Sequence, residues 1–126
     1  MSVFKELLAI KAFRENKAEI AVRKQRAVLA EATAAQEQAA QSLDQFRSWA
    51  DAHERSLYQD LCARLVRLHD IEDVQVAVAG MRTREVEHEE QLRRAEEARI
   101  RQAEQLDADR RLHQEATRMK EKFVEL

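Results

Sequence analysis

The chain has 126 residues and a formal net charge of −2, with 37% charged and 5% aromatic residues. Because it contains one glycine and no proline, it offers few places for the tight turns of a compact globular domain. Its net charge gives no overall basic field that would attract nucleic acid or anionic lipid. The abundance of Ala, Glu, Gln, Arg and Leu, with apolar residues at regular spacing, predicts an all-α fold of long ordered helices.

The first predicted helix runs from about residue 2 to about residue 67. Steps of three and four residues alternate from its N-terminus, as in the seam of a coiled coil. The seam positions in this register are Phe4, Leu7, Lys11, Arg14, Ala18, Ala21, Gln25, Val28, Ala32, Ala35, Ala39, Ser42, Phe46, Trp49 and His53. Because the middle of this seam is mostly alanine, we expect it to bury little apolar area and the isolated protein to be marginally stable.

A change in the heptad spacing predicts a reversal of the chain near its midpoint. The next leucines, which step by four, four and three, are Leu57, Leu61, Leu65 and Leu68. Asp70 can act as the N-cap of a second helix, and Asp73 would then lie in the first turn, where its charge suits the helix dipole. We therefore predict the turn at residues 67–71. Gly80 is the competing turn site, and if helical it costs about 1 kcal/mol relative to alanine.

The second predicted helix runs from about residue 71 to about residue 125. Its apolar stripe is expected at Val74, Val78, Met81, Leu92, Ala95, Ile100, Ala103, Leu106, Leu112, Ala116, Met119, Phe123 and Leu126. The two helices would form an antiparallel two-helix coiled-coil hairpin that spans residues 1–126 as a single unit. Because such a hairpin satisfies its own seam, we expect a monomer in isolation.

The sequence contains no pattern typical of catalysis, of a cofactor site or of a metal centre. The four histidines show no i, i+4 pairing with one another, and HExxH, CxxC and glycine-rich phosphate loops are absent. His88 has glutamates on both sides in the sequence, but consecutive helical residues point in different directions and do not converge on one ion. The lone Cys62 is interpreted as a helix-packing thiol, and it fits a reducing compartment. We therefore expect a cytoplasmic protein that is not an enzyme and is not inserted in a membrane, since no apolar run approaches roughly 20 residues.

Charge is unevenly distributed along the first predicted helix. Residues 2–28 carry a balance of +4, and residues 29–60 carry −4. One interpretation is a solvated helix surface, and the other is a hairpin whose free end is basic and whose shaft is acidic. Because a hairpin brings its termini together, the basic residues of the free end would be Lys5, Lys11, Arg14, Lys17, Arg23, Lys24, Lys120 and Lys122.

Two segments of the chain resemble a known family. They are "LLAIKAFRENKAEIAVRKQRAVLAEA" near the N-terminus and "LYQDLCARLVRLHDIEDVQVAVAGMRTRE" at the midpoint. Together they are similar to the YscO/FliJ group of type III secretion proteins, which are non-enzymatic central stalks of the export ATPase. The resemblance implies an antiparallel two-helix coiled coil, peripheral to the inner-membrane secretion apparatus, whose termini enter the pore of a hexameric secretion ATPase.

The same resemblance implies that the hairpin tip faces the ring-shaped cytoplasmic domain of the export gate, and that some members also bind unloaded secretion chaperones. The expected gate-binding residues of the tip are Tyr58, Leu61, Leu65 and Leu68. These leucines also have a structural interpretation, in which they lock the reversal of the chain. The alternative function is a generic coiled-coil scaffold or oligomerisation protein, and oligomeric state separates the two. A nucleic-acid binder is disfavoured by the acidic shaft, and would show steep salt dependence.

Overall fold

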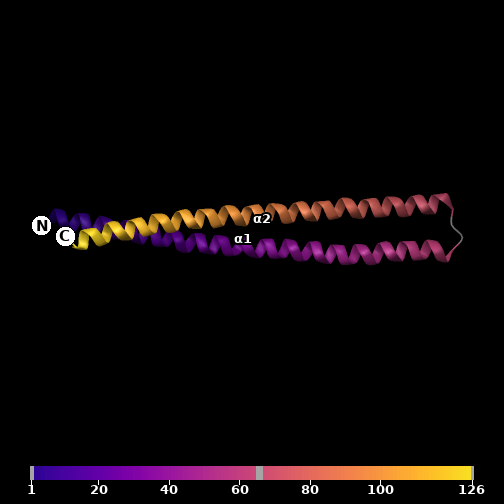
Figure 1. The fold of residues 1–126 in the computed structure, drawn as a ribbon, viewed down its shortest axis with the longest axis horizontal. Coiled ribbons are helices and arrows are strands. Elements are labelled where there is room, and N and C mark those ends of the chain that lie inside the picture. The colour runs from indigo at the N-terminus through magenta and orange to yellow at the C-terminus, as the bar shows by residue number, and fades with distance from the viewer. Residues whose placement is uncertain (1, 65–66, 126) are drawn as a thin grey trace. The chain divides into compact units, whose positions relative to one another are not determined.

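The computed structural model describes residues 2–64 and 67–125, and two α-helices make up nearly all of these ranges. Helix α1 is Ser2–Ala63 and helix α2 is Leu68–Glu125. The chain divides into two compact units, unit 1 with residues 1–34 and 97–126 and unit 2 with residues 35–96. Within each unit, a segment of α1 packs against a segment of α2 that runs in the opposite direction (Figure 1). The predicted all-α hairpin fold is confirmed.

The break between the helices lies a few residues earlier than predicted. Helix α1 ends at Ala63 and α2 begins at Leu68, whereas the expected turn was at residues 67–71. The competing turn site, Gly80, lies inside α2. The midpoint of the chain is therefore where the reversal occurs, but the residues that end α1 carry no glycine or proline that would have marked its boundary.

The start of α2 is capped by a different arrangement from the one predicted. The backbone N–H groups of Asp70 and Ile71 donate to the carbonyl oxygen of Arg67, at 3.0 and 3.4 Å. The Arg67 N–H in turn donates to Oδ2 of Asp70, at 3.1 Å. Arg67 is thus the N-cap residue, and Asp70 lies in the first turn and reaches back to it, as the third residue of a capping box does. The prediction that Asp70 is the N-cap is wrong, although its carboxylate still stabilises this helix end.

The buried seam of α1 shares only alternate positions with the predicted heptad. Leu7, Arg14, Val28 and Trp49 of that register are exposed. The less exposed positions that replace the others of that register are Leu8, Glu15, Val22, Leu29, Gln36, Leu43 and Ala50. Each lies one residue after the position that was predicted. Val22 and Leu43 are larger apolar residues than the Ala21 and Ser42 that they replace, so the seam buries more apolar surface at these two positions than the predicted register implied, whereas Ala50 is smaller than Trp49.

The seam of α2 follows an unbroken heptad from Val74 to Phe123. Its members are Val74, Val78, Met81, Glu85, His88, Leu92, Ala95, Arg99, Gln102, Leu106, Asp109, His113, Ala116, Lys120 and Phe123. The predicted stripe departs from this heptad at Ile100, Ala103, Leu112 and Met119; Ala103 is half-buried and the other three are exposed. Its last member, Leu126, lies outside the described residues.

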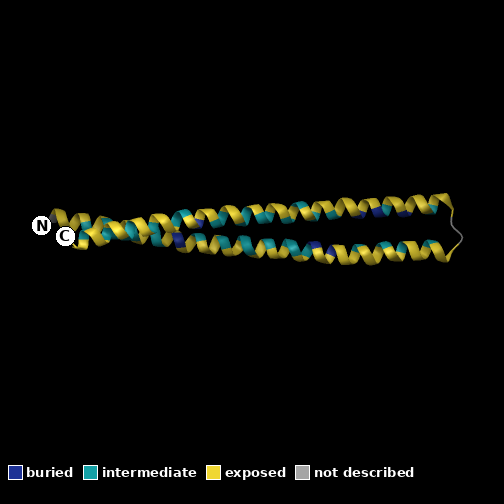
Figure 2. Ribbon diagram, viewed as in Figure 1, coloured by how far each residue is buried: buried dark blue, intermediate teal, exposed yellow. Residues whose placement is uncertain are grey.

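The most deeply buried residues lie at separate places along the helices (Figure 2). In unit 2, Phe46 packs with Val74, Val78 and Met81, and Leu61 is among the residues that pack against this cluster. In unit 1, the buried apolar residues among those described are Val22 and Leu106. Between these places alanine and polar residues occupy most seam positions, with Leu29, Leu43 and Leu92 as the larger apolar residues, so burial is uneven along the seam.

Polar side chains join α1 to α2 within unit 1. The Gln25 side-chain amide donates to the backbone oxygen and to Oε1 of Gln102, at 3.0 and 2.7 Å. The Lys120 ammonium lies 2.9 Å from a carboxylate oxygen of Glu15. All of these side chains occupy seam positions, so they fix which residues of α1 face which residues of α2.

In unit 2 an arginine fork joins the two helices. The Nε and Nη2 groups of Arg47 donate to carboxylate oxygens of Glu85 and Glu89, at 3.0 and 2.9 Å. The hydrogen bond to Glu85 is the main cause of a pKa of Arg47 above its ordinary value. Because Arg47 is exposed, the fork orients the helices more than it stabilises them.

Candidate partner-binding surfaces

Unit 1 contains the first turns of α1 and the last turns of α2 (Figure 1). The rings of Phe4 and Phe123 face one another there, with centroids 6.3 Å apart. The Lys11 ammonium lies 5.5 Å from the centroid of the Phe123 ring, within the range of a cation–π contact. The first and last turns of the described chain are thus tied together by aromatic and cationic side chains.

The predicted basic residues all lie in unit 1 and fall into two groups. Three contact neighbours: Lys11 lies over Phe123, Arg23 pairs with Glu19 at 2.5 Å, and Lys120 pairs with Glu15. The others are exposed, and within the described ranges no hydrogen bond or ion pair involves them; they are Lys5, Arg14, Lys17, Lys24 and Lys122. The second group is therefore free to meet an acidic partner.

The two units carry charge of opposite sign. Unit 1 contains 14 basic and 11 acidic residues, for a net charge of +3. Unit 2 contains 8 basic and 13 acidic residues, for a net charge of −5. The small net charge of the whole chain thus hides a basic unit with the chain ends and an acidic unit with the turn.

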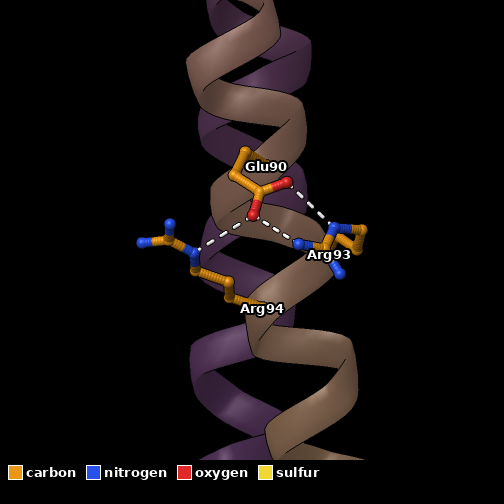
Figure 3. A network of polar contacts seen from close by, with 3 residues as sticks. All are labelled: Glu90, Arg93 and Arg94. Carbon is orange, nitrogen blue, oxygen red and sulfur yellow. Dashed lines mark hydrogen bonds and ion pairs between the residues drawn. The ribbon is translucent and has the colours of Figure 1, made fainter.

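Part of the acidic charge of unit 2 is balanced on the surface of α2 itself. The Glu90 carboxylate accepts hydrogen bonds from both nitrogens of Arg93 that face it and, at 3.2 Å, from Nε of Arg94 (Figure 3). The bond from Arg93 is the main reason that the pKa of Glu90 lies below its ordinary value. These are contacts between residues three and four apart on one exposed helix face, which support the helix and require no ligand.

The predicted gate-binding residues of the tip have different environments. Tyr58 and Leu68 are 46% and 72% exposed. Leu61 is half-buried against the Phe46 cluster, as expected of a leucine that locks the helices together. Leu65 lies outside the described residues.

One feature near the tip was not predicted. Cys62 is exposed, so its interpretation as a helix-packing thiol is wrong. It lies on the same side of α1 as Tyr58, in a shallow and mainly apolar depression that Arg55, Gln59 and Ala63 also line. The spacing of these residues, one and two helical turns apart, was visible in the sequence, but nothing in the sequence indicated that this side of α1 faces away from α2.

An aromatic cluster in unit 2 was also missed. Trp49 was predicted in the seam but is 47% exposed. Its ring stacks on His53, with centroids 4.9 Å apart, and the Arg84 guanidinium lies 5.5 Å from the ring centroid. Arg84 also covers the ring of buried Phe46, at 4.9 Å. Arg84 therefore shields the apolar core from the side on which Trp49 is exposed.

Over residues 2–64 and 67–125, no three His, Cys, Asp or Glu side chains are grouped so that they could hold a metal ion. Neither α1 nor α2, over these same residues, includes a stretch that is apolar enough and long enough to cross a membrane.

The fold identifies the chain first as a helical-hairpin protein. It superposes on the crystal structure of the type III secretion protein YscO from Vibrio parahaemolyticus with a TM-score of 0.89 and 24% sequence identity, over 98% of this chain and 78% of that chain. The family model for the type III secretion protein YscO matches residues 4–126. The chain therefore belongs to the YscO family of type III secretion proteins, which confirms the resemblance seen in the sequence. Comparison with curated protein sequences gives no match.

Proposed function

We propose that this protein is a non-enzymatic central stalk of a type III secretion ATPase, with unit 1 bound in the pore of the hexamer. The observation that supports this most is the basic character of unit 1. This unit has a net charge of +3 and includes exposed lysines that have no partner among the described residues, and the first turns of α1 and the last turns of α2 belong to it. Because the chain belongs to a type III secretion family, the ATPase that we propose as its partner is the one of a type III secretion system. The protein would act in the cytoplasm, at the periphery of the inner-membrane apparatus.

The strength of such a contact depends on how many charges act together. A single exposed ion pair contributes about 0.2–1 kcal/mol, which is too little to hold a stalk. A pore formed by several identical subunits presents each carboxylate many times, so several lysines can each find a partner. Charge complementarity of this kind acts mainly on the association rate and on salt sensitivity.

We propose that the turn region of unit 2 binds a different partner. Tyr58 and Leu68 are apolar or amphipathic side chains that remain exposed, and Tyr58 borders the depression that contains Cys62. Tyrosine is enriched in the centres of protein interfaces. We assign this surface to the cytoplasmic ring of the export gate. Secretion chaperones without cargo are a second class of partner that the family resemblance implies.

The ATPase contact is tested by reversing charge at Lys5 and Lys24 together. The variant Lys5→Glu/Lys24→Glu should lose stimulation of the purified secretion ATPase, and wild-type stimulation should fall steeply between about 0.05 and 0.5 M salt because exposed charges are screened. The matched control is Arg55→Glu/Arg64→Glu, which makes the same change in net charge near the end of α1 and at the residue that follows it. It should stimulate the ATPase as the wild type does.

Two results would contradict this proposal. If both double variants stimulate equally at every salt concentration, the basic surface has no role in ATPase binding. If wild-type protein does not bind the ATPase at all and sediments instead as a defined oligomer, the generic scaffold function is favoured.

A further inference from the structure

One side of unit 1 carries a groove between α1 and α2. It consists of two adjoining depressions that share Arg14 and Leu112. The remaining lining residues are Lys11, Lys17, Ala18 and Ala21 from α1, and Asp109, Glu115, Ala116 and Met119 from α2. The groove is thus built from residues 11–21 and 109–119, which belong to the same compact unit.

The groove lies beside a second, unoccupied heptad of α1. Leu7, Arg14, Ala21 and Val28 recur every seven residues and are all exposed, because α2 packs against the seam one residue further on. On α2, Leu112 and Met119 are likewise seven residues apart and exposed. Positions seven residues apart lie on one side of a helix, so α1 and α2 each present part of a stripe along which another helix can pack.

The floor and the rims of the groove define the chemistry of its occupant. Ala18 and Ala21 are small, so a helix can approach α1 closely. The α1 rim is basic, with Lys11, Arg14 and Lys17, whereas the α2 rim carries carboxylates of Asp109 and Glu115. The complementary segment has apolar residues facing the floor, carboxylates towards α1 and basic side chains towards α2.

We propose that this groove binds an amphipathic α-helix of a partner protein, with an acidic flank along α1 and a basic flank along α2, to form a three-helix bundle. The inference goes beyond the proposed function, because it specifies that the partner segment is an α-helix and which of its flanks is acidic and which is basic. It is tested without the ATPase, so its failure leaves the charge-reversal experiment above unaffected, and the converse also holds.

The test uses a synthetic peptide of three heptads with leucines in the seam positions, glutamates on one flank and lysines on the other, labelled with fluorescein. Titration with the full-length protein should raise its anisotropy. Ala21→Glu should weaken binding at least about tenfold, because it puts a carboxylate on the apolar floor. Its matched control is Ala27→Glu, which makes the same change at another exposed alanine of α1 outside the groove and should bind as the wild type does.

A second pair of variants addresses packing without a change of charge. Leu112→Ala removes an apolar wall of the groove and should weaken binding about tenfold, corresponding to loss of a well-packed side chain. Ile100→Ala removes a comparably exposed side chain of α2 that does not line the groove, and should have no effect. Circular dichroism verifies that each variant keeps its helices.

The flanks provide a test of direction. A nitroxide at the peptide N-terminus should broaden resonances at one end of the groove only, and exchanging the Glu and Lys flanks should move the broadening to the other end. Equal binding of a peptide with glutamines on both flanks would overturn the electrostatic part of the proposal. Unchanged binding to Ala21→Glu would overturn the site. A dimer of the protein alone that Ala21→Glu dissociates, seen by sedimentation velocity, would mean that a second copy occupies the groove.

Discussion

The position of the seam in α1 is tested by two valines of unit 1. Val22 is 6% exposed and faces α2, whereas Val28 is 40% exposed and lies outside the buried seam. The heptad predicted from the sequence has the opposite arrangement, with Val28 in the seam. Replacing each valine separately with alanine therefore compares the two registers with the same chemical change, in the same helix and six residues apart.

The expected difference in the free energy of unfolding follows from burial. Valine to alanine removes two methyl-sized groups, each of about 0.8 kcal/mol when buried, and leaves a small cavity. Alanine also has the higher helix propensity, by about 0.5 kcal/mol, at both positions. We expect Val22→Ala to destabilise the protein by about 1–2 kcal/mol. Val28→Ala should lie within about 0.5 kcal/mol of the wild type, since its transfer loss is smaller and the propensity gain offsets it.

Urea unfolding followed by circular dichroism at 222 nm measures both variants. With a slope of about 2 kcal/mol per molar urea, the two midpoints should differ by roughly 0.5–1 M. The slope itself should not change, because neither substitution alters how much surface unfolding exposes. Equal midpoints, or a lower midpoint for Val28→Ala than for Val22→Ala, would refute the register described here.

Substitutions at three further positions have defined outcomes. Phe46→Ala should destabilise unit 2 by about 3–4 kcal/mol in the same urea assay, and a loss below about 1 kcal/mol would contradict its burial. Asp70→Ala should cost about 1 kcal/mol through loss of the bond from the Arg67 N–H, with Asp70→Asn intermediate; equal costs would show that the side-chain acceptor has no role. The variant Glu90→Gln tests a pH dependence. The pKa of Glu90 in the folded protein lies below its ordinary value of 4.5. The ionised Glu90 carboxylate therefore contributes to stability above pH 4.5, and this contribution declines as the pH falls through the folded pKa. The stability difference between wild type and Glu90→Gln should therefore shrink below about pH 4.5, and a difference that grows on acidification would contradict the contact with Arg93.

The fold could be predicted because composition alone limits the number of turns. With one glycine and no proline, two long helices were the simplest arrangement, and the cluster of leucines indicated the midpoint. The exact turn could not be predicted from Asp70, because an aspartate stabilises a helix start either as the N-cap or in the first turn. The two possibilities differ by three residues, which accounts for most of the error at the start of α2.

The register could not be predicted because α1 carries two overlapping heptads. Positions such as Ala18 and Phe46 belong to both, and the sequence gives no rule for which neighbouring set, Ala21 or Val22, faces α2. Only the partner helix decides this. The predicted ATPase-binding residues were affected as well. Lys11 and Lys120 were expected to be available to a partner, but they lie at the seam and contact Phe123 and Glu15 of the same chain.

The polar pairs of the seam and the exposed second heptad are physically related. Alanine-rich helix pairs slide easily, because a shift by one heptad replaces one small residue with another at little cost. In unit 1 such a shift would separate Gln25 from Gln102 and Lys120 from Glu15; a fully buried group left without a partner costs about 1–3 kcal/mol, and the cost is smaller where water reaches the group, as at Lys120. The polar pairs therefore fix the alignment of α1 with α2 at the expense of some apolar burial. A groove whose walls come from both helices keeps Arg14 opposite Leu112 only while that alignment holds. A seam selected for strength alone could be fully apolar, whereas a seam that must also present a defined neighbouring surface benefits from polar residues at intervals.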